Sequence, residues 1–560
     1  MSAAPNAFDV TKFLQFDEMT ELLHGYVSAH PELASLSSAG RSFEDREIWV
    51  MTLTNQKSGD ASSKPAMYID GNIHAGEVTG GNVCLYTIDH LLGNYGSDER
   101  VTHLMDTTTF YIVPRQQPDG VEKYLTTPYT LRSSVRHWPT QEEDHGLYEE
   151  DIDGNGIILQ MRVPDPNGEW KISDKDPRLM IKREPDDVTG TFYRIYTEGM
   201  LRDPRPEPLK FATSPYGIDQ NRNWPANWSP WQKGGGAYPL SEPETAAVAR
   251  FIEDHPNIVI VQNYHTTGGV ILRSPCAEGD QTLPKADVEI YKAMGEIGER
   301  LTGYPCTPVY DAFPMTDDQG RRATSGGFIE WTYGHKGILS FATELWDIKS
   351  RAGIPRDAND AMRVVKEETE DDGLKLLEWN DREMGERGFV PWTPFDHPQL
   401  GNVEIGGWNS KLVRQNAPPQ FLEDECERNL QFSLSQAAMM PQLSFKLIDT
   451  ESLGNDLHIV RATLENRGFL PTTGSALGTR LNLPPLSVKV EGAEVLIGRP
   501  KIETGHLPGR SSALVGRNRP GQFRVENERL IEVLVRGSGE ITITAESDRA
   551  GTTTKTVTLA

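Results

Sequence analysis

His74-Ala-Gly-Glu77 lies between two apolar runs, Pro65-Ala-Met-Tyr-Ile-Asp70 and Gly81-Asn-Val-Cys-Leu-Tyr-Thr-Ile-Asp-His-Leu-Leu92. The first run is typical of a buried strand and the second of a helix, so His74 and Glu77 fall on the turn between them. Imidazole nitrogen and carboxylate oxygen both bind zinc, and two such residues three apart on a turn can bind one ion. Because the pattern is short, a chance pairing on a solvated loop is the alternative, and the metal hypothesis requires a distant third ligand.

His265 is the candidate for that third ligand. It ends the run Asn257-Ile-Val-Ile-Val-Gln-Asn-Tyr264, which reads as a buried parallel strand. Open α/β sheets bind their ligands at the carboxyl ends of such strands. A histidine at a strand end is often structural, but here it would complete the three protein ligands of a catalytic zinc.

Two further segments carry candidate functional residues. Glu344 lies inside the apolar run Gly337–Trp346. A buried carboxylate needs a cation or a hydrogen-bond network, so Glu344 is either a structural ion-pair partner or a general base beside the metal. Asn221 and Arg222 lie in the polar stretch Gly217–Trp224 and could clamp a carboxylate, although a surface arginine in a polar loop is common.

The order of these motifs resembles the carboxypeptidase A-like zinc metallocarboxypeptidases. The resemblance covers roughly residues 15–385 and includes Pro118-Asp-Gly120 and Ser241-Glu-Pro-Glu244. It implies that His74, Glu77 and His265 bind one Zn²⁺ and that Glu344 is the general base and later the general acid. It also implies that Asn221 and Arg222 bind the substrate's C-terminal carboxylate and that Asp219 orients the first histidine.

The chain departs from the family pattern at several positions. Gly76 stands where an arginine is common, and Arg322 stands where the family has a tyrosine over the substrate's end. Ile329 matches a residue of the side-chain pocket and suggests tolerance of apolar C-terminal residues. The arginine that stabilises the oxyanion is Arg132 or Arg136, and its distance from Pro118-Asp-Gly120 favours Arg132.

The resemblance implies zinc-dependent hydrolysis of the C-terminal peptide bond of peptides that carry a free carboxylate. The alternative is a zinc amidohydrolase of the same fold that acts on N-acyl amino acids or cell-wall peptides. A non-catalytic binding protein is a third hypothesis, but such a protein would not need the proton-transferring Glu344.

The predicted fold is α/β, with a mixed, largely parallel central sheet flanked by helices and a C-terminal antiparallel β-sandwich. We expect a catalytic domain over residues 1–385 with an insertion at about 121–215, a connector over 386–440 and the sandwich over 441–560. Short alternating runs such as Leu457–Leu464 and Glu540–Ala545 indicate the sandwich. Ser241 and Glu244 predict a helix N-terminus with a capping box.

Composition limits the partners and the compartment. The net charge of −25 argues against nucleic acid as a partner. No apolar run reaches the roughly 18–20 residues of a membrane span, so no membrane partner is expected. The first residues have no basic patch and no apolar core, which predicts a cytoplasmic protein, with secretion as the alternative. If the chain were exported, Cys276 and Cys306 could pair.

The insertion contains Asp151-Ile-Asp-Gly-Asn-Gly156, which resembles the start of a calcium loop. Asp151, Asp153 and Asn155 alternate as oxygen ligands of a hard cation would. Arg162 stands where a complete EF-hand has its bidentate glutamate, so an acidic turn without calcium is the favoured interpretation.

Overall fold

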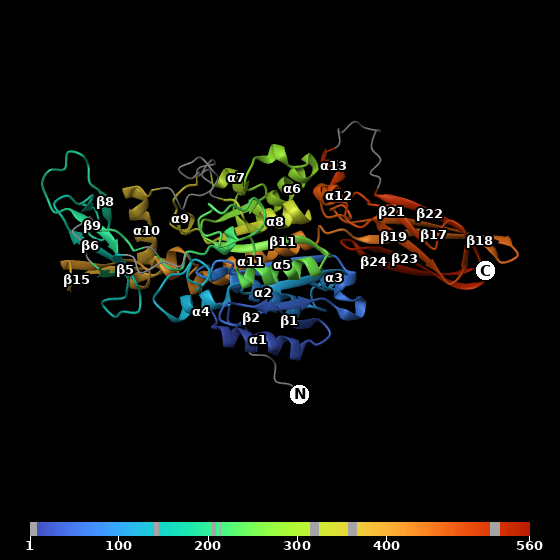
Figure 1. Ribbon diagram of the computed structural model, residues 1–560, viewed down its shortest axis with the longest axis horizontal. Coiled ribbons are helices and arrows are strands. Elements are labelled where there is room, and N and C mark those ends of the chain that lie inside the picture. The colour runs from blue at the N-terminus through green and yellow to red at the C-terminus, as the bar shows by residue number, and fades with distance from the viewer. Residues whose placement is uncertain are drawn as a thin grey trace.

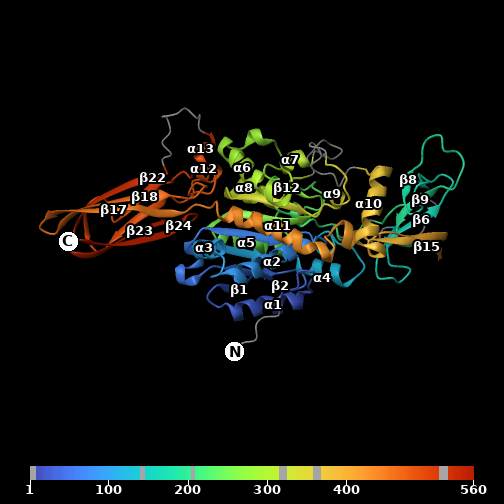
Figure 2. The same ribbon diagram turned by 180° about the vertical axis from the view of Figure 1, so that it is seen from behind.

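The computed structural model describes residues 8–138, 145–203, 209–212, 214–313, 324–356, 367–515 and 527–559. Three parts lie in a row along the long axis of the molecule (Figure 1). An α/β unit occupies the centre, a small sheet built largely from the insertion lies at one end, and the C-terminal sandwich lies at the other. Figure 2 shows the same order from behind.

The central unit is built on an eight-stranded sheet in the order β1-β2-β4-β3-β11-β14-β12-β13. The adjoining strands β4, β3, β11 and β14 are parallel, whereas β1, β2 and β12 pair antiparallel to their inner neighbours. The strands are β1 (Ala34–Arg41), β2 (Glu47–Leu53), β3 (Ala66–Gly71), β4 (Thr109–Val113), β11 (Ile258–Thr266), β12 (Val270–Arg273), β13 (Cys306–Pro308) and β14 (Leu339–Leu345). This sheet confirms the predicted mixed, largely parallel α/β fold.

Helices cover both faces of this sheet. Alternate residues of β3 face opposite sides: Met67 and Ile69 pack with α2, α6 and α11, whereas Ala66 and Tyr68 pack with α5 and α8. The helices are α1 (Phe16–Ala29), α2 (Thr79–Asn94), α3 (Glu99–Thr107), α4 (Pro118–Thr126), α5 (Pro243–Asp254), α6 (Lys285–Thr302), α7 (Val309–Ala312), α8 (Phe328–Lys336), α9 (Ile348–Arg351), α10 (Glu370–Glu383) and α11 (Pro419–Ala437). The central strands β3, β11 and β14 are therefore buried on both faces.

The insertion forms its own sheet together with strands from a distant part of the chain. Its strands are β5 (Gly146–Glu149), β6 (Gln160–Pro164), β7 (Trp170–Ile172), β8 (Met180–Lys182), β9 (Tyr193–Thr197) and β10 (Gly199–Arg202). Strands β15 (Phe389–His397) and β16 (Gly401–Trp408) extend this sheet in the order β15-β16-β6-β9-β7-β8. Strands β5 and β10 pair separately.

Residues 386–440, the predicted connector, contain regular secondary structure. Besides β15 and β16 they form a π-helical turn over Ser410–Arg414 and the long helix α11. Cys426, Leu430 and Phe432 of α11 are fully buried in the core of the central unit. The segment therefore packs against both the insertion sheet and the central unit.

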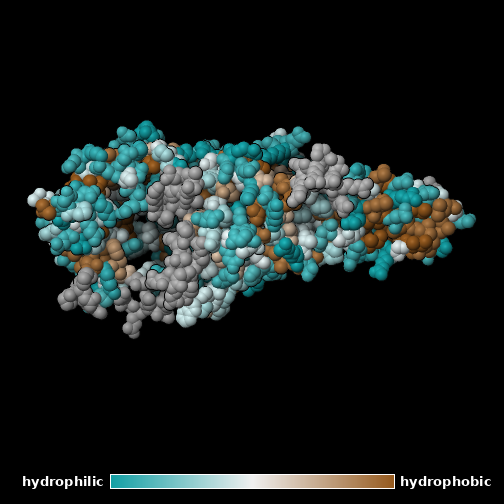
Figure 3. Space-filling view, turned by 90° about the horizontal axis from the view of Figure 1, so that it is seen from above, coloured by the Kyte–Doolittle hydropathy of each residue, from teal (hydrophilic) through white to brown (hydrophobic). Residues whose placement is uncertain are grey.

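The C-terminal part is an antiparallel β-sandwich, as predicted. Its sheets have the orders β17-β18-β22-β20 and β21-β19-β23-β24 and enclose a separate apolar core. The elements are β17 (Leu443–Gly454), β18 (Leu457–Asn466), α12 (Ala476–Arg480), β19 (Leu486–Glu491), β20 (Glu494–Ile497), β21 (Lys501–Gly505), α13 (Ser512–Val515), β22 (Glu528–Arg536), β23 (Gly539–Ser547) and β24 (Gly551–Leu559). Apolar surface gathers at this end of the molecule (Figure 3), where Leu447, Ile497 and Leu530 are exposed.

The start of α5, the four cysteines and the length of the helices each bear on a prediction from the sequence. The capping-box prediction at Ser241 is wrong, because α5 begins at Pro243 with Glu242 as its N-cap residue and no side-chain cap. Cys84, Cys276, Cys306 and Cys426 are all free thiols. Among the described residues, no helix is long and apolar enough to cross a membrane.

Candidate metal centre

The register of the central strands brings the predicted site residues together. His265 on β11 is the direct neighbour of Glu344 on β14, so the two side chains project from the same side of the sheet. Strand β3 pairs with β11 up to Gly71 and Tyr264, and the turn that carries His74 and Glu77 follows immediately. The carboxyl ends of three parallel strands thus converge on one point.

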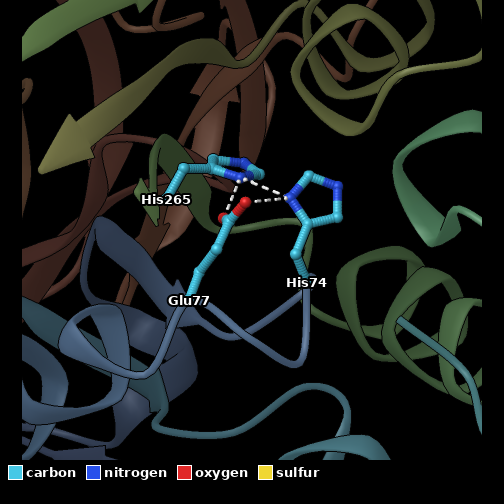
Figure 4. A group of neighbouring side chains, drawn as sticks. All are labelled: His74, Glu77 and His265. Carbon is cyan, nitrogen blue, oxygen red and sulfur yellow. Dashed lines mark hydrogen bonds and ion pairs between the residues drawn. The ribbon is translucent and has the colours of Figure 1, made fainter. Parts of the chain in front are cut away.

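His74, Glu77 and His265 point toward one another at that point (Figure 4). The two carboxylate oxygens of Glu77 lie 2.9 Å from Nδ1 of His74 and 2.9 Å from Nδ1 of His265. The two Nδ1 atoms are 3.0 Å apart, and all three side chains are buried. This group has the donor set and spacing to hold one metal ion.

Both imidazoles are fixed through their outer nitrogens. Nε2 of His74 lies 3.1 Å from Oδ1 of Asp219, and Nε2 of His265 contacts Oδ1 of Asn263. Because both partners are hydrogen-bond acceptors, each Nε2 carries the proton and each Nδ1 presents a lone pair to the shared centre. Two lone pairs and a carboxylate that converge in a buried space fit a bound cation.

Asn263 is a site residue that sequence reasoning missed. It lies two residues before His265 and therefore on the same side of β11. Its Nδ2 donates to Oδ1 of the buried Asp70 at 2.6 Å, which holds the amide in the orientation that accepts from His265. The available signal was the polar pair Gln262-Asn263 within an otherwise apolar strand.

Glu344 and Arg132 line the same cavity as the three candidate ligands. Burial raises the pKa of the Glu344 carboxyl above its ordinary value, and the nearby charge of Glu77 adds to this effect. Arg132 donates to Oε1 of Glu77 at 3.1 Å and to Oδ2 of Asp219 at 3.2 Å. Although burial opposes the charged form of Arg132, these carboxylates hold its pKa above the ordinary value.

Arg136, the alternative to Arg132, faces another part of the molecule. Its guanidinium forms a two-pronged ion pair with Glu242 and lies over the ring of Trp138. It does not line the metal cavity, whereas Arg132 does. The geometry therefore favours Arg132 as the arginine that could meet a reacting carbonyl.

Asn221, Arg222 and Ile329 line the cavity, which has a volume of about 220 Å³. Asn221 accepts from the backbone N–H of Phe328 at 2.8 Å through Oδ1, and its carbonyl accepts from Nη1 of Arg222 at 2.8 Å. Ile329 lies on the wall together with further apolar residues: Leu272, Val309, Phe313 and Ala342. Arg322 falls outside the described residues, so its role stays a prediction.

A model of the family described as zinc carboxypeptidase matches residues 19–370. The chain belongs to the zinc carboxypeptidase family. The family predicted from the order of the sequence motifs is thereby confirmed. Residues 442–558 match a second model, a domain of unknown function.

Several zinc carboxypeptidase relatives are similar over parts of the chain. Carboxypeptidase A2 of Rattus norvegicus is 22% identical over 61% of this chain and 64% of its own length. Carboxypeptidase D of Anas platyrhynchos is 35% identical over 19% of this chain, and the match spans only 8% of that protein. A zinc carboxypeptidase of Saccharothrix mutabilis is 30% identical over 23% of this chain and 28% of its own.

Among solved structures, thrombin activatable fibrinolysis inhibitor is 15% identical, with a TM-score of 0.45, and covers 78% of this chain and 76% of its own. Carboxypeptidase A from Helicoverpa armigera is 17% identical, with a TM-score of 0.41, and covers 68% of this chain and 75% of its own.

A residue outside the family-matched region anchors the metal-binding turn. Asn416, which is fully buried, donates to the carbonyl of Gly76 at 2.7 Å and accepts from the N–H of Thr79 at 3.1 Å. A Cβ atom at position 76 would lie about 3.0 Å from Gln415, Tyr124 and the carbonyl of Leu131, so this position favours glycine. Asn416 therefore fixes the turn that carries His74 and Glu77 through hydrogen bonds, and Gln415 packs against Gly76.

The calcium hypothesis concerns a separate group on the insertion. Carboxylate oxygens of Asp151, Asp153 and Glu198 lie within 4.8 Å of one another. Most of these oxygens already accept backbone N–H groups, such as Gly156 N to Asp151 at 2.8 Å and Leu159 N to Glu198 at 2.9 Å. The side-chain oxygen of Asn155 accepts the N–H of Ile157 at 2.8 Å within the loop. Calcium binding at Asp151, Asp153 and Asn155 stays a prediction.

Proposed function

We propose that the protein is a zinc-dependent carboxypeptidase that removes the C-terminal residue of peptides with a free carboxylate. The observation that carries this proposal is a single cavity lined by His74, Glu77, His265, Glu344 and Arg222. Family membership supports zinc as the ion, and two nitrogens with one carboxylate are a zinc donor set. When bound, zinc would supply a Lewis acid that polarises the scissile carbonyl and makes a water more acidic.

Glu344 is proposed to move the protons of the reaction. A carboxylate beside the metal ligands can take a proton from the attacking water and return it to the leaving amine. A raised pKa makes Glu344 a stronger base, which suits both transfers near neutral pH. The guanidinium of Arg132, fixed by Glu77 and Asp219, would stabilise negative charge that develops on the carbonyl oxygen.

Arg222 and Asn221 are proposed to make the enzyme an exopeptidase. The contact of Arg222 with the carbonyl of Asn221 holds the guanidinium at the cavity wall, where it can bind the terminal carboxylate of a peptide. Asp219 fixes this turn by accepting the N–H of Asn221 at 2.8 Å while it orients His74. Binding the chain end at a fixed distance from the metal selects the last peptide bond.

The apolar wall of the cavity suggests the preferred C-terminal residue. Leu272, Val309, Phe313, Ile329 and Ala342 offer aliphatic and aromatic surface near the carboxylate-binding pair. We expect apolar C-terminal side chains to be accepted over charged ones, because an apolar wall cannot compensate a desolvated charge.

The decisive experiment compares blocked dipeptides with a free or an amidated C-terminus, in the wild type and in Arg222→Met. The free acid should be hydrolysed and the amide should not. Arg222→Met should lower kcat/KM for the free acid roughly 10- to 100-fold, the loss expected for a hydrogen bond to a charged group. Equal rates on acid and amide would overturn the exopeptidase proposal.

The panel should also contain N-acyl amino acids and a cell-wall peptide to test the amidohydrolase alternative. Exclusive hydrolysis of these compounds would favour that alternative. Glu344→Gln, which keeps the size of the side chain, should lose activity on every substrate by roughly 10²-fold or more while zinc stays bound. Full activity of this variant would refute the proposed proton transfer.

A further inference from the structure

A second cavity, of about 240 Å³, adjoins the metal cavity. Thr267 lines both cavities, and it lies two residues after His265. Neither Asn221 nor Arg222 lines the second cavity. A peptide whose carboxylate is bound by Arg222 must continue beyond the metal, and Thr267 marks a route from the metal cavity into this space.

Cationic side chains line this second cavity. Lys349 comes from α9, and Lys411 and Arg414 come from the π-helical turn Ser410–Arg414. Arg414 and Lys349 share one carboxylate, that of Glu368, with Lys349 Nζ 3.5 Å from Oε1. This concentration of positive charge lies in a chain whose net charge is −25.

Lys411 has no ion-pair partner among the residues that the structure describes. Its half-buried ammonium donates to the carbonyl of Thr127 at 2.5 Å and lies 4.4 Å from the ring centre of Tyr124. Burial lowers the pKa of Lys411 to about 8. An incoming carboxylate would give this ammonium an ion-pair partner and would raise its pKa again.

The one carboxylate that lines this cavity is already engaged. Among the described lining residues it belongs to Asp347, which accepts from Nη2 of Arg356 at 2.8 Å and from the N–H of Ser350 at 3.1 Å. These contacts tie Asp347 to the start of α9, so it does not neutralise Lys411.

We propose that this second cavity binds acidic side chains of the substrate on the N-terminal side of the scissile bond. The proposal rests on the proposed carboxypeptidase function and specifies its substrates as peptides with Asp or Glu close to the C-terminus. Because the two cavities share Thr267 and each extended residue spans about 3.3–3.6 Å, we assign the second cavity to the penultimate residue of the peptide and the residue before it.

Two of the three cations of this subsite come from outside the family-matched region, whereas Lys349 lies within it. Lys411 and Arg414 lie beyond residues 19–370. The adjacent Asn416 bonds to Gly76 on the metal-binding turn, so these cations are held in a fixed position relative to the metal site. Preorganised charge of this kind discriminates between substrates with little entropic cost.

The test uses blocked tripeptides with one apolar C-terminal residue and with Glu, Gln or Lys at the penultimate position or at the position before it. The measured quantity is the ratio of kcat/KM for the Glu peptide to that for the Gln peptide. We expect this ratio to be roughly 10 in the wild type and to decline as salt is added. The value of kcat/KM for the Lys peptides should be lower than that for the Gln peptides.

Three variants assign that ratio to the cavity. Lys411→Met should bring it to about 1–2, whereas Lys411→Arg should retain most of it because the charge is kept. Glu368→Gln should increase the ratio, since it removes the charge shared by Arg414 and Lys349. Lys285→Met, an exposed lysine at the start of α6, is the matched control and should leave the ratio unchanged.

The outcomes separate the two proposals. A wild-type ratio of 1, with free-acid peptides still hydrolysed, would overturn the acidic subsite and leave the carboxypeptidase function intact. A high ratio that survives Lys411→Met and does not rise in Glu368→Gln would also overturn it. Hydrolysis of no free-acid peptide at all would overturn the proposed function and the subsite with it.

Discussion

At the scale of single residues, the two histidines proposed as metal ligands depend on partners that leave only one nitrogen of each imidazole available. Asp219 holds His74 and Asn263 holds His265, each through Nε2. The second of these contacts depends in turn on Asp70, which binds Nδ2 of Asn263 at 2.6 Å. Such partners usually affect metal affinity because they fix the ring orientation and the tautomer.

Asn263→Ala should therefore weaken zinc binding roughly 10- to 100-fold, the loss typical for the partner of a ligating histidine. The measurement is a competition titration against a chromophoric zinc chelator. Thermal unfolding of the zinc-free variant serves as the control for general damage to the buried strand. Unchanged zinc affinity in a folded variant would show that Asn263 does not position His265.

The candidate ligands and Asp219 could be predicted from the sequence, whereas Asn263 could not. His74, Glu77, His265 and Glu344 are polar residues at the ends of apolar runs, and parallel strands bring such ends together. Asn263 could be recognised only from the direction of its side chain and from Asp70 on the adjoining strand. These facts depend on strand register, which a single sequence does not specify.

At the scale of elements, helix α5 buries an acidic residue near its N-terminus. Glu244 accepts from the N–H of Phe43 at 2.9 Å and from Nε2 of Gln220 at 2.7 Å. Burial raises the pKa of Glu244 from 4.5 to about 7, and the charges of Asp119 and Glu242 contribute to the rise. The residue that sequence analysis assigned to a capping box thus joins α5 to the loop after β1.

Glu244→Gln should stabilise the protein more at pH 8 than at pH 5. Because its pKa is raised, Glu244 keeps a proton in the folded state that it loses in the unfolded state. The resulting loss of stability begins near pH 4.5, grows up to about pH 7 and stays constant at higher pH. The variant lacks this titration, so its free energy of unfolding should exceed that of the wild type by up to about 3 kcal/mol at pH 8. Gln220 can turn its amide to accept from the new side chain, because its Oε1 has no partner among the described residues.

The check is urea unfolding of both proteins at several pH values from 5 to 8. The difference in the free energy of unfolding between variant and wild type should rise with pH and level off above 7. A difference independent of pH would mean that Glu244 titrates normally in the folded protein.

The elements of the central sheet were predictable, because continuous apolar runs identify strands buried on both faces. Strands β15 and β16 were not. Alternate residues of β15 are exposed, and its run contains Pro391 and Pro394, which favoured an irregular connector. The strand β6, which pairs with β16, lies more than 200 residues earlier, so no local sequence pattern indicates the pairing.

At the scale of the whole molecule, the β-sandwich contacts the central unit at the C-terminal end of α8. Arg549, which is buried, donates to the carbonyls of Gly337 at 2.9 Å and Thr473 at 2.8 Å. Asp287 on α6 accepts the N–H groups of Ala476 at 2.7 Å and Leu477 at 2.9 Å. Because α8 carries Ile329 and leads into β14, the sandwich supports elements of the site.

Arg549→Met should lower the free energy of unfolding by about 1–3 kcal/mol, since it removes the hydrogen bonds from Arg549 to the carbonyls of Gly337 and Thr473. Removal of a buried charge offsets part of the larger loss that several broken hydrogen bonds would otherwise cause. The control is Arg461→Met on the exposed face of the sandwich, which should change stability by less than about 0.5 kcal/mol. Equal effects of the two substitutions would mean that Arg549 does not stabilise the junction.

The central claim is that His74, Glu77 and His265 bind one zinc ion. The most direct measurement is the zinc content per chain, by inductively coupled plasma mass spectrometry, after loading with zinc and dialysis. The wild type and Glu344→Gln should retain one zinc, and folded His265→Phe should retain well under half of that. One zinc per chain in His265→Phe, or none in the wild type, would contradict the account.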